Sequence, residues 1–221
     1  MPPAVATREL PQMSSIAQVT IHASQFPEAV RRDLLASLRT RQVNQKFHYD
    51  SVKQTQRWLA LHQQYGLRYL CAVPSTLYGP GYHTDGRQMH FIFDLIRKII
   101  RGKELGERVV LWGDGQQSRE VMFLPDFVRL LGALAASRDN DLVNIGAGEE
   151  HTIRRFAELI CEIVGYPAER IEYDTSRYVG ARTKCLNVAR LRSIIPSYEL
   201  TSLEHGLRET IRWFYDVKAY R

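Results

Sequence analysis

Regular alternation of short apolar segments with amphipathic segments is the feature of this sequence that most restricts its fold. Strand-like apolar runs occupy residues 67–74, 109–113, 142–146 and 170–174. Between them, apolar residues recur every three or four positions and predict helices over residues 52–65, 89–103, 126–137 and 153–164. Strands that alternate with helices in this way predict an α/β protein with a parallel sheet.

Capping and turn residues predict where several of these elements begin and end. Thr152 is expected to cap the helix that Gly165 ends. Thr201 and Glu204 have the spacing of a capping box, which predicts the start of a last helix running to Phe214. Residues 78–86, YGPGYHTDG, are rich in turn residues and are predicted to form a loop.

Charge and cysteine content narrow the class of partner. The chain has 30 Lys and Arg against 24 Asp and Glu, a net charge of +6, which favours an anionic partner. The basic residues are scattered, which argues against nucleic acid and leaves a nucleotide diphosphate as the better candidate. Three cysteines without metal-binding spacing indicate a cytoplasmic protein with no metal site. No apolar run approaches the ~18 residues that span a bilayer, so no membrane partner is expected.

Tyr49 and Lys53 are the first candidates for catalysis. They lie four residues apart, and so on one face of a helix about one turn apart. A neighbouring ammonium stabilises a phenolate and lowers the pKa of the tyrosine, which lets it exchange a proton near neutral pH. The pair alone is weak evidence, because an ordinary surface Tyr/Lys pair has the same spacing.

Several motifs follow Tyr49 and Lys53 in a fixed order. They are a strand leading into VPSTLYGPG, then LWGDGQQSREVMFLPD (111–126), LVNIGAGEEHTI (142–153) and RTKCLNVARL (182–191). In this order and spacing the chain resembles the extended short-chain dehydrogenase/reductase family, the NAD-dependent epimerase/dehydratases, over about residues 14–215. Within that family it looks most like the epimerase-reductases that act on a GDP-4-keto-6-deoxymannose.

The resemblance implies a fold and a domain organisation. The expected fold is an incomplete Rossmann-like, doubly wound parallel sheet with a smaller C-terminal α/β part that binds substrate. Residues 1–80 would be the remnant of a dinucleotide-binding domain, and residues 81–221 the nucleotide-sugar-binding part. The two are expected to interleave as one compact unit.

The resemblance also assigns roles to single residues. It implies a proton donor in Tyr49, assisted by Lys53 and Ser14, and an acid/base in His90. The alternative for His90 is a residue at a helix start without a role. The implied cofactor contacts are Tyr49, Lys53 and Pro74. The implied substrate contacts are Thr76, Lys98, Trp112, Arg119 and Lys184, although Trp112 could equally be an ordinary core residue.

Two positions depart from the family pattern. Ile16 stands where the related epimerase-reductases have a proton-transferring cysteine, which puts a double epimerisation in doubt. Thr76 stands where the family usually has an asparagine. These departures favour a second interpretation, in which the chain is a non-catalytic subunit or a nucleotide-sugar-binding pseudoenzyme.

The cofactor half of the family pattern is not found in the sequence. The family's GxxGxxG turn, which holds the pyrophosphate of NAD or NADP, does not occur, and Gly146-Ala-Gly148 is predicted to be a turn between a strand and a helix. We therefore expect NADP or NAD to be held with help from a partner chain that carries this turn, or in a homo-oligomer. A truncated sequence is the third interpretation.

Overall fold

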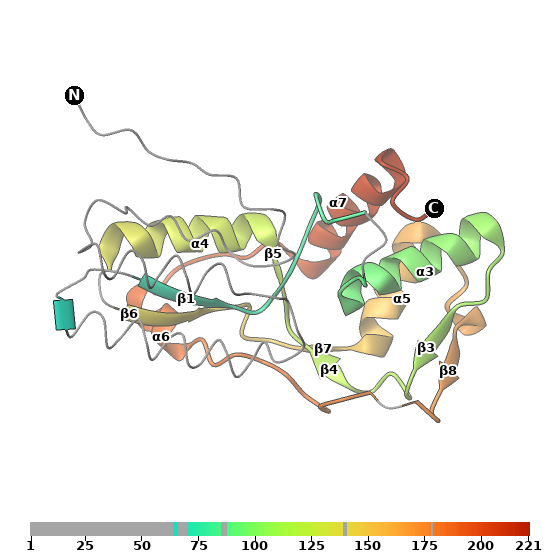
Figure 1. Cartoon of the computed structure of the whole chain (residues 1–221), viewed down its shortest axis with the longest axis horizontal. Helices are drawn as coiled ribbons and strands as arrows, with labels where there is room; N and C mark the ends of the chain where they lie inside the picture. Colours follow the sequence, from blue (N-terminus) through green and yellow to red (C-terminus); the bar gives the residue numbers. More distant parts are fainter. Residues whose placement is uncertain (1–63, 66–69, 85–87, 139–140, 178) are drawn as a thin grey trace. The chain divides into compact units, whose positions relative to one another are not determined.

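A computed structural model describes residues 64–65, 70–84, 88–138, 141–177 and 179–221 (Figure 1). The chain divides into two units, residues 1–67 and 68–221, and the fold given below is that of the second unit. The predicted helix over residues 52–65 lies outside the described residues except at Gln64 and Tyr65, which are helical. The domain boundary at residue 80 stays a prediction.

One layered part of the fold is built on a parallel strand pair. Strand β1 (Leu70–Pro74) pairs with β6 (Asp141–Ile145), with Leu70 opposite Asp141 and Pro74 opposite Ile145. Helix α4 (Leu124–Ser137) covers one face of the pair and α6 (Ala189–Ile194) lies on the other (Figure 1). Both faces are thus packed against helices, as expected for a parallel sheet.

The chain changes its strand partner at Ser75. The Ser75 N–H donates to the carbonyl of Ile145 at 3.1 Å, which ends the contact with β6. The next strand, β2 (Thr76–Tyr78), pairs in parallel with β5 (Val121–Phe123). The two strand pairs therefore diverge next to the carboxyl end of β6.

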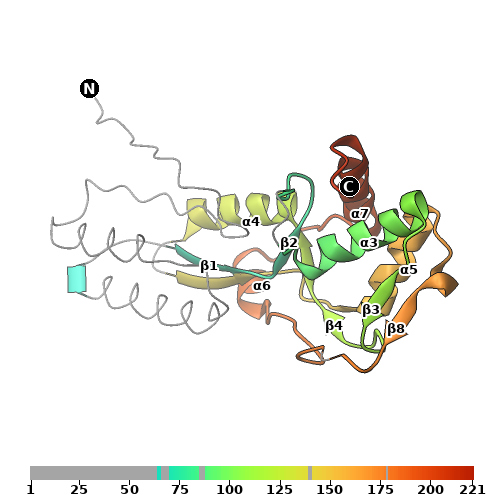
Figure 2. The same cartoon turned by 45° about the vertical axis from the view of Figure 1, so that its right-hand side comes forward.

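A second part of the fold is held by three helices. Helix α3 (Phe91–Leu105) packs against α5 (Ile153–Val164), which packs against α7 (Leu203–Asp216) (Figure 2). Fully buried side chains fill the space between them: Ile92, Ile96, Ile99, Ile100, Phe156, Ile160, Leu207 and Phe214. Since these residues recur at helical spacing, their burial explains the apolar periodicity of the sequence.

Short strands complete this second part. Strand β3 (Val110–Trp112) pairs in parallel with β8 (Glu172–Asp174), which follows a 3-10 turn at Ala168–Arg170. Strand β4 (Ser118–Arg119) pairs antiparallel with β7 (His151–Thr152). The described strands thus form parallel pairs with one antiparallel addition, and the predicted α/β class is confirmed.

Most predicted helix ends are confirmed, and one is wrong. The Thr152 hydroxyl accepts a hydrogen bond from the Arg155 N–H at 3.1 Å, and Gly165 ends α5 in the left-handed conformation with φ 76°. The predicted capping role of Thr201 is wrong, because Ser202 caps α7 by accepting from the His205 N–H at 3.3 Å. The Thr201 N–H instead donates to the Asp126 carboxylate at 2.8 Å.

Candidate functional site

Three predicted site residues come from separate elements. His90 is the residue before α3, and its N–H donates to the Tyr82 hydroxyl at 3.1 Å. Arg119 lies on β4, and Lys184 lies on an extended segment beside that strand. The segment is joined to the β4 region by hydrogen bonds from the Ser118 N–H to the Arg182 carbonyl (2.8 Å) and from the Glu120 N–H to the Lys184 carbonyl (3.1 Å).

The charges of Lys184 and Arg119 act on His90. Burial among protein atoms lowers the pKa of His90, although one side of the residue is open to solvent. The positive charges of Lys184 and then of Arg119 lower this pKa further, since a nearby cation disfavours the imidazolium. The structure therefore places an imidazole whose protonation is disfavoured within the influence of an ammonium and a guanidinium, an arrangement suited to an anion.

Arg119 is held in place by backbone carbonyls. Its guanidinium donates to the carbonyl of Ser118 at 2.6 Å and to that of Val179 at 3.3 Å, and the residue is half-buried. A guanidinium has five N–H donors, so these bonds orient the group and leave donors for a ligand. A held guanidinium loses little conformational freedom when it binds phosphate oxygens, which favours tight binding.

Trp112 is not a core residue. It ends β3 with 56% of its surface exposed, so the core alternative is wrong. The guanidinium of Arg177 lies 5.6 Å from the centre of the Trp112 ring and pairs with Asp174 at 3.4 Å. Arg177 was not among the residues predicted from the sequence, since its only signal there is a cation three residues after β8.

Lys98 lies on α3 and forms an ion pair with Asp94 at 3.0 Å. It follows His90 by eight residues, which places it about 12 Å further along the helix. The ion pair of Lys98 is therefore a half-buried pair within one helix, and its predicted role in substrate binding stays a prediction.

Pro74 and Thr76 lie on either side of the point where the strand pairs diverge. Pro74 ends β1 opposite Ile145, and Thr76 begins β2 opposite Val121. Between them, the Ser75 hydroxyl oxygen is buried without a hydrogen-bond partner among the described residues. Ligands of α/β proteins bind outside the carboxyl ends of parallel strands, so this hydroxyl is a further candidate contact.

Ser14, Tyr49 and Lys53 lie outside the described residues, so their predicted roles stay predictions.

Within the described part of the chain, no group of three or more His, Cys, Asp or Glu side chains is arranged to hold a metal ion. No helix in that part has both the length and the apolar character needed to cross a bilayer.

Sequence comparisons identify relatives of part of this chain. A model of the NAD dependent epimerase/dehydratase family matches residues 22–146. A dTDP-4-dehydro-6-deoxy-D-allose reductase from Streptomyces bikiniensis is 32% identical over 69% of this chain and 45% of its own length. A GDP-L-fucose synthase from Azorhizobium caulinodans is 31% identical over 66% of this chain and 47% of its own length. The chain thus spans about half the length of these relatives.

Solved structures agree with the sequence matches. A UDP-glucose 4-epimerase from Thermotoga maritima, determined with UDP-glucose, aligns with a TM-score of 0.64 and 28% identity over 75% of this chain and 52% of its own. A GDP-L-fucose synthetase from Naegleria fowleri, determined with NADP, aligns with a TM-score of 0.60 at 22% identity over 66% of this chain and 45% of its own, a likeness of fold alone. The predicted Rossmann-type class is confirmed. The chain belongs to the NAD-dependent epimerase/dehydratase family.

Proposed function

We propose that this chain binds a nucleoside-diphosphate sugar and takes part in the reduction or epimerisation of a 4-keto sugar. The observation that carries this proposal is that backbone hydrogen bonds hold the segment of Lys184 beside the β4 region, which carries Arg119. The charges of both residues also lower the pKa of His90. A diphosphate beside these residues would neutralise the two cations that disfavour a charged His90. The names of relatives, a dTDP-4-keto-sugar reductase and a GDP-L-fucose synthase, support this class of substrate.

Other residues would hold the two ends of the substrate. The exposed face of Trp112 suits stacking against a nucleobase, and Arg177 holds the indole from one side. Thr76, at the start of β2, would donate a hydrogen bond to the sugar part. A diphosphate between these ends would extend toward Arg119 and Lys184.

The described residues fit one end of a nicotinamide cofactor. The unpartnered, buried Ser75 hydroxyl and the adjacent Pro74 lie at the carboxyl end of β1, where such a group binds in Rossmann-type folds. NADP or NAD would supply the hydride for a keto-sugar reduction. That NADP or NAD is held with help from a second polypeptide, or within a homo-oligomer, is part of this proposal.

The chemistry of this chain's residues follows from their types. Lys53 would lower the pKa of Tyr49, which would then give a proton to the sugar oxygen, with Ser14 donating a hydrogen bond there. His90 would exchange a proton at the carbon next to the ketone. A second candidate function is nucleotide-sugar binding without turnover, which the unusual Ile16 and Thr76 favour.

Titration and turnover distinguish the two candidate functions. Calorimetric titration with GDP, UDP and dTDP is expected to show binding of at least one of them, and absence of any binding would contradict the proposal. NADPH oxidation is then followed with the 4-keto sugar of that nucleotide, with and without a partner chain. Oxidation that is lost in Tyr49→Phe supports catalysis, and equal rates would exclude Tyr49 as proton donor. Binding without oxidation would favour the second candidate.

Ligand binding is expected to raise the pKa of His90. In the free protein, burial and the cations Lys184 and Arg119 lower this pKa. A bound diphosphate adds negative charge that favours the imidazolium, so the pKa should move upward. An NMR titration of the imidazole proton, with and without the nucleotide, measures the change, and the resonance is assigned by its loss in His90→Gln. An unchanged or lower pKa would place the diphosphate elsewhere.

A further inference from the structure

Glu120 is a buried carboxylate that joins three separate segments of the chain. It lies between β4 and β5, and only 3% of its surface is exposed. One of its carboxylate oxygens accepts from the Gly148 N–H at 2.8 Å, and the other accepts from the Leu186 N–H at 2.7 Å. Burial of a charge is costly unless its oxygens are hydrogen-bonded, and here each oxygen has a backbone donor.

The turn after β6 leaves room for this carboxylate. A Cβ atom added at Gly146 would lie 2.2 Å from a Glu120 oxygen, closer than any side chain permits. The turn from Gly146 to Gly148 therefore encloses the carboxylate at the place where the two strand pairs diverge. None of the roles assigned above to site residues uses Glu120.

Both cationic residues of the candidate site depend on the position of Glu120. Arg119 is its chain neighbour, and its guanidinium bonds the carbonyls of Ser118 and Val179, whereas the Glu120 carboxylate bonds Gly148 and Leu186. Lys184 is joined to Glu120 by the hydrogen bond from the Glu120 N–H, at 3.1 Å, and Leu186, two residues later, is bound by the carboxylate. One residue thus fixes the distance between the segments that carry Arg119 and Lys184.

We propose that Glu120 is a positioning residue for diphosphate binding, which sets the spacing of Arg119 and Lys184 through its two backbone hydrogen bonds. This inference rests on the proposed function. It predicts that a change at Glu120 acts on ligand affinity and not only on folding stability.

The test replaces Glu120 by glutamine. The amide keeps the size of the side chain but puts an NH₂ group against one of the two backbone N–H donors, so one hydrogen bond is lost. The dissociation constant for the nucleoside diphosphate that the wild-type chain binds best, among GDP, UDP and dTDP, is expected to rise about tenfold. The constant for the corresponding nucleoside, which lacks phosphates, should change little.

Asp126→Asn is the matched control. Asp126 is also buried, with 5% of its surface exposed, and it also binds a backbone N–H, that of Thr201 at 2.8 Å. It lies on α4 and accepts from Arg129, and among the described residues it has no hydrogen bond to β4 or to the Lys184 segment. Both variants should have a lower melting temperature, and only Glu120→Gln should lose affinity, measured at a temperature where both are folded.

The outcomes separate this inference from the proposed function. If the wild-type chain binds no nucleoside diphosphate, the proposed function fails. If the wild type binds and Glu120→Gln binds equally well, only the positioning role is overturned.

If Glu120→Gln does not fold, Glu120→Asp, which keeps the charge but shortens the reach, takes its place. If neither folds, hydrogen exchange of the wild type decides: bound diphosphate should slow exchange at Gly148 and Leu186, and unchanged rates would overturn the proposal.

Discussion

Replacement of Arg119 by alanine is expected to weaken nucleoside-diphosphate binding about 100-fold. The variant loses a guanidinium that two backbone carbonyls hold beside Lys184 and His90. Charge-assisted hydrogen bonds each contribute roughly 1.5–3 kcal/mol, and the loss of two weak or one strong bond gives an effect of this size. Calorimetric titration measures the dissociation constant. The ionic strength is kept fixed, because salt screens the interactions of exposed charges.

Arg154→Ala is the control for Arg119→Ala. Arg154 is also half-buried and also donates to a backbone carbonyl, that of Asp114 at 3.1 Å, but it stacks on Tyr173 with its guanidinium carbon 4.2 Å from the ring centre. It should leave the dissociation constant unchanged. Arg119→Lys should bind with intermediate affinity, since an ammonium keeps the charge but not the forked geometry. Equal constants for the two alanine variants would mean that Arg119 makes no contact with the ligand.

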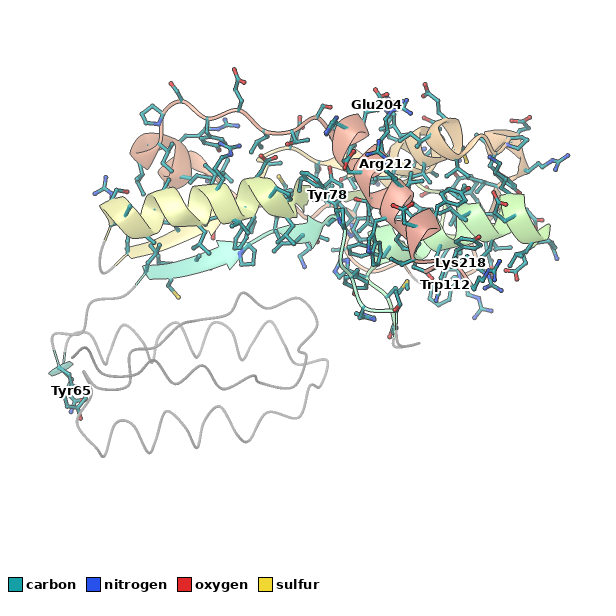
Figure 3. The ribbon with its side chains drawn as sticks, turned by 90° about the horizontal axis from the view of Figure 1, so that it is seen from above. Tyr65, Tyr78, Trp112, Glu204, Arg212 and Lys218 are labelled. Atoms are coloured by element: carbon teal, nitrogen blue, oxygen red, sulfur yellow. The ribbon has the colours of Figure 1, made fainter. Side chains whose placement is uncertain are left out.

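Alanine at Gly206 is expected to destabilise the protein by about 2 kcal/mol or more, although alanine favours helices. Gly206 lies within α7, and a Cβ atom there would be 2.3 Å from the Tyr78 hydroxyl and 3.1 Å from the Phe123 ring. Tyr78, labelled beside α7 in Figure 3, is buried and cannot move away freely. Overpacking of a filled core typically costs about 1–3 kcal/mol. Denaturant unfolding measures the change in free energy of unfolding.

Gly132 is the matched position for Gly206. It lies within α4, and a Cβ atom added there meets no atom within 4 Å. Gly132→Ala should therefore stabilise the protein by about 0.5–1 kcal/mol, the ordinary gain from replacing glycine in a helix. Tyr78→Phe combined with Gly206→Ala should recover part of the loss, because the nearest atom is removed. The contact between Gly206 and Tyr78 would be unimportant if both alanine variants were stabilised alike.

The sequence predicted the longer elements because their apolar residues must face a core. Ile96, Ile99 and Ile100 of α3 are all fully buried, as their spacing required. Prediction from the sequence was wrong where two neighbouring residues were equally suited to cap the same helix. Thr201 and Ser202 are both good capping residues, and the choice of Ser202 follows from the distant Asp126, which binds the Thr201 N–H. The short strands β2, β4, β5 and β7 have too few residues to show any periodicity.

The candidate site was predictable only through ordered motifs. His90, Arg119 and Lys184 lie far apart in the sequence, and neither spacing nor composition brings them together; the family resemblance did. Glu120 and Ser75 were missed, because a buried carboxylate and an unpartnered hydroxyl are recognised from their surroundings. The sequence left open whether Trp112 is a core residue or a ligand contact. An aromatic residue in a strand is usually buried, and this one is exposed.

The parallel pairing of β1 with β6 has a consequence during synthesis of the chain. Asp141, the partner of Leu70, follows it by 71 residues, so β1 leaves the ribosome long before its partner exists. At typical rates of translation this delay is roughly 4 to 14 s, which is long compared with the collapse of a small chain. During that time the edge of β1 is open to pairing with other nascent chains. A block of slowly translated codons between β2 and β6 would lengthen this interval and favour aggregation.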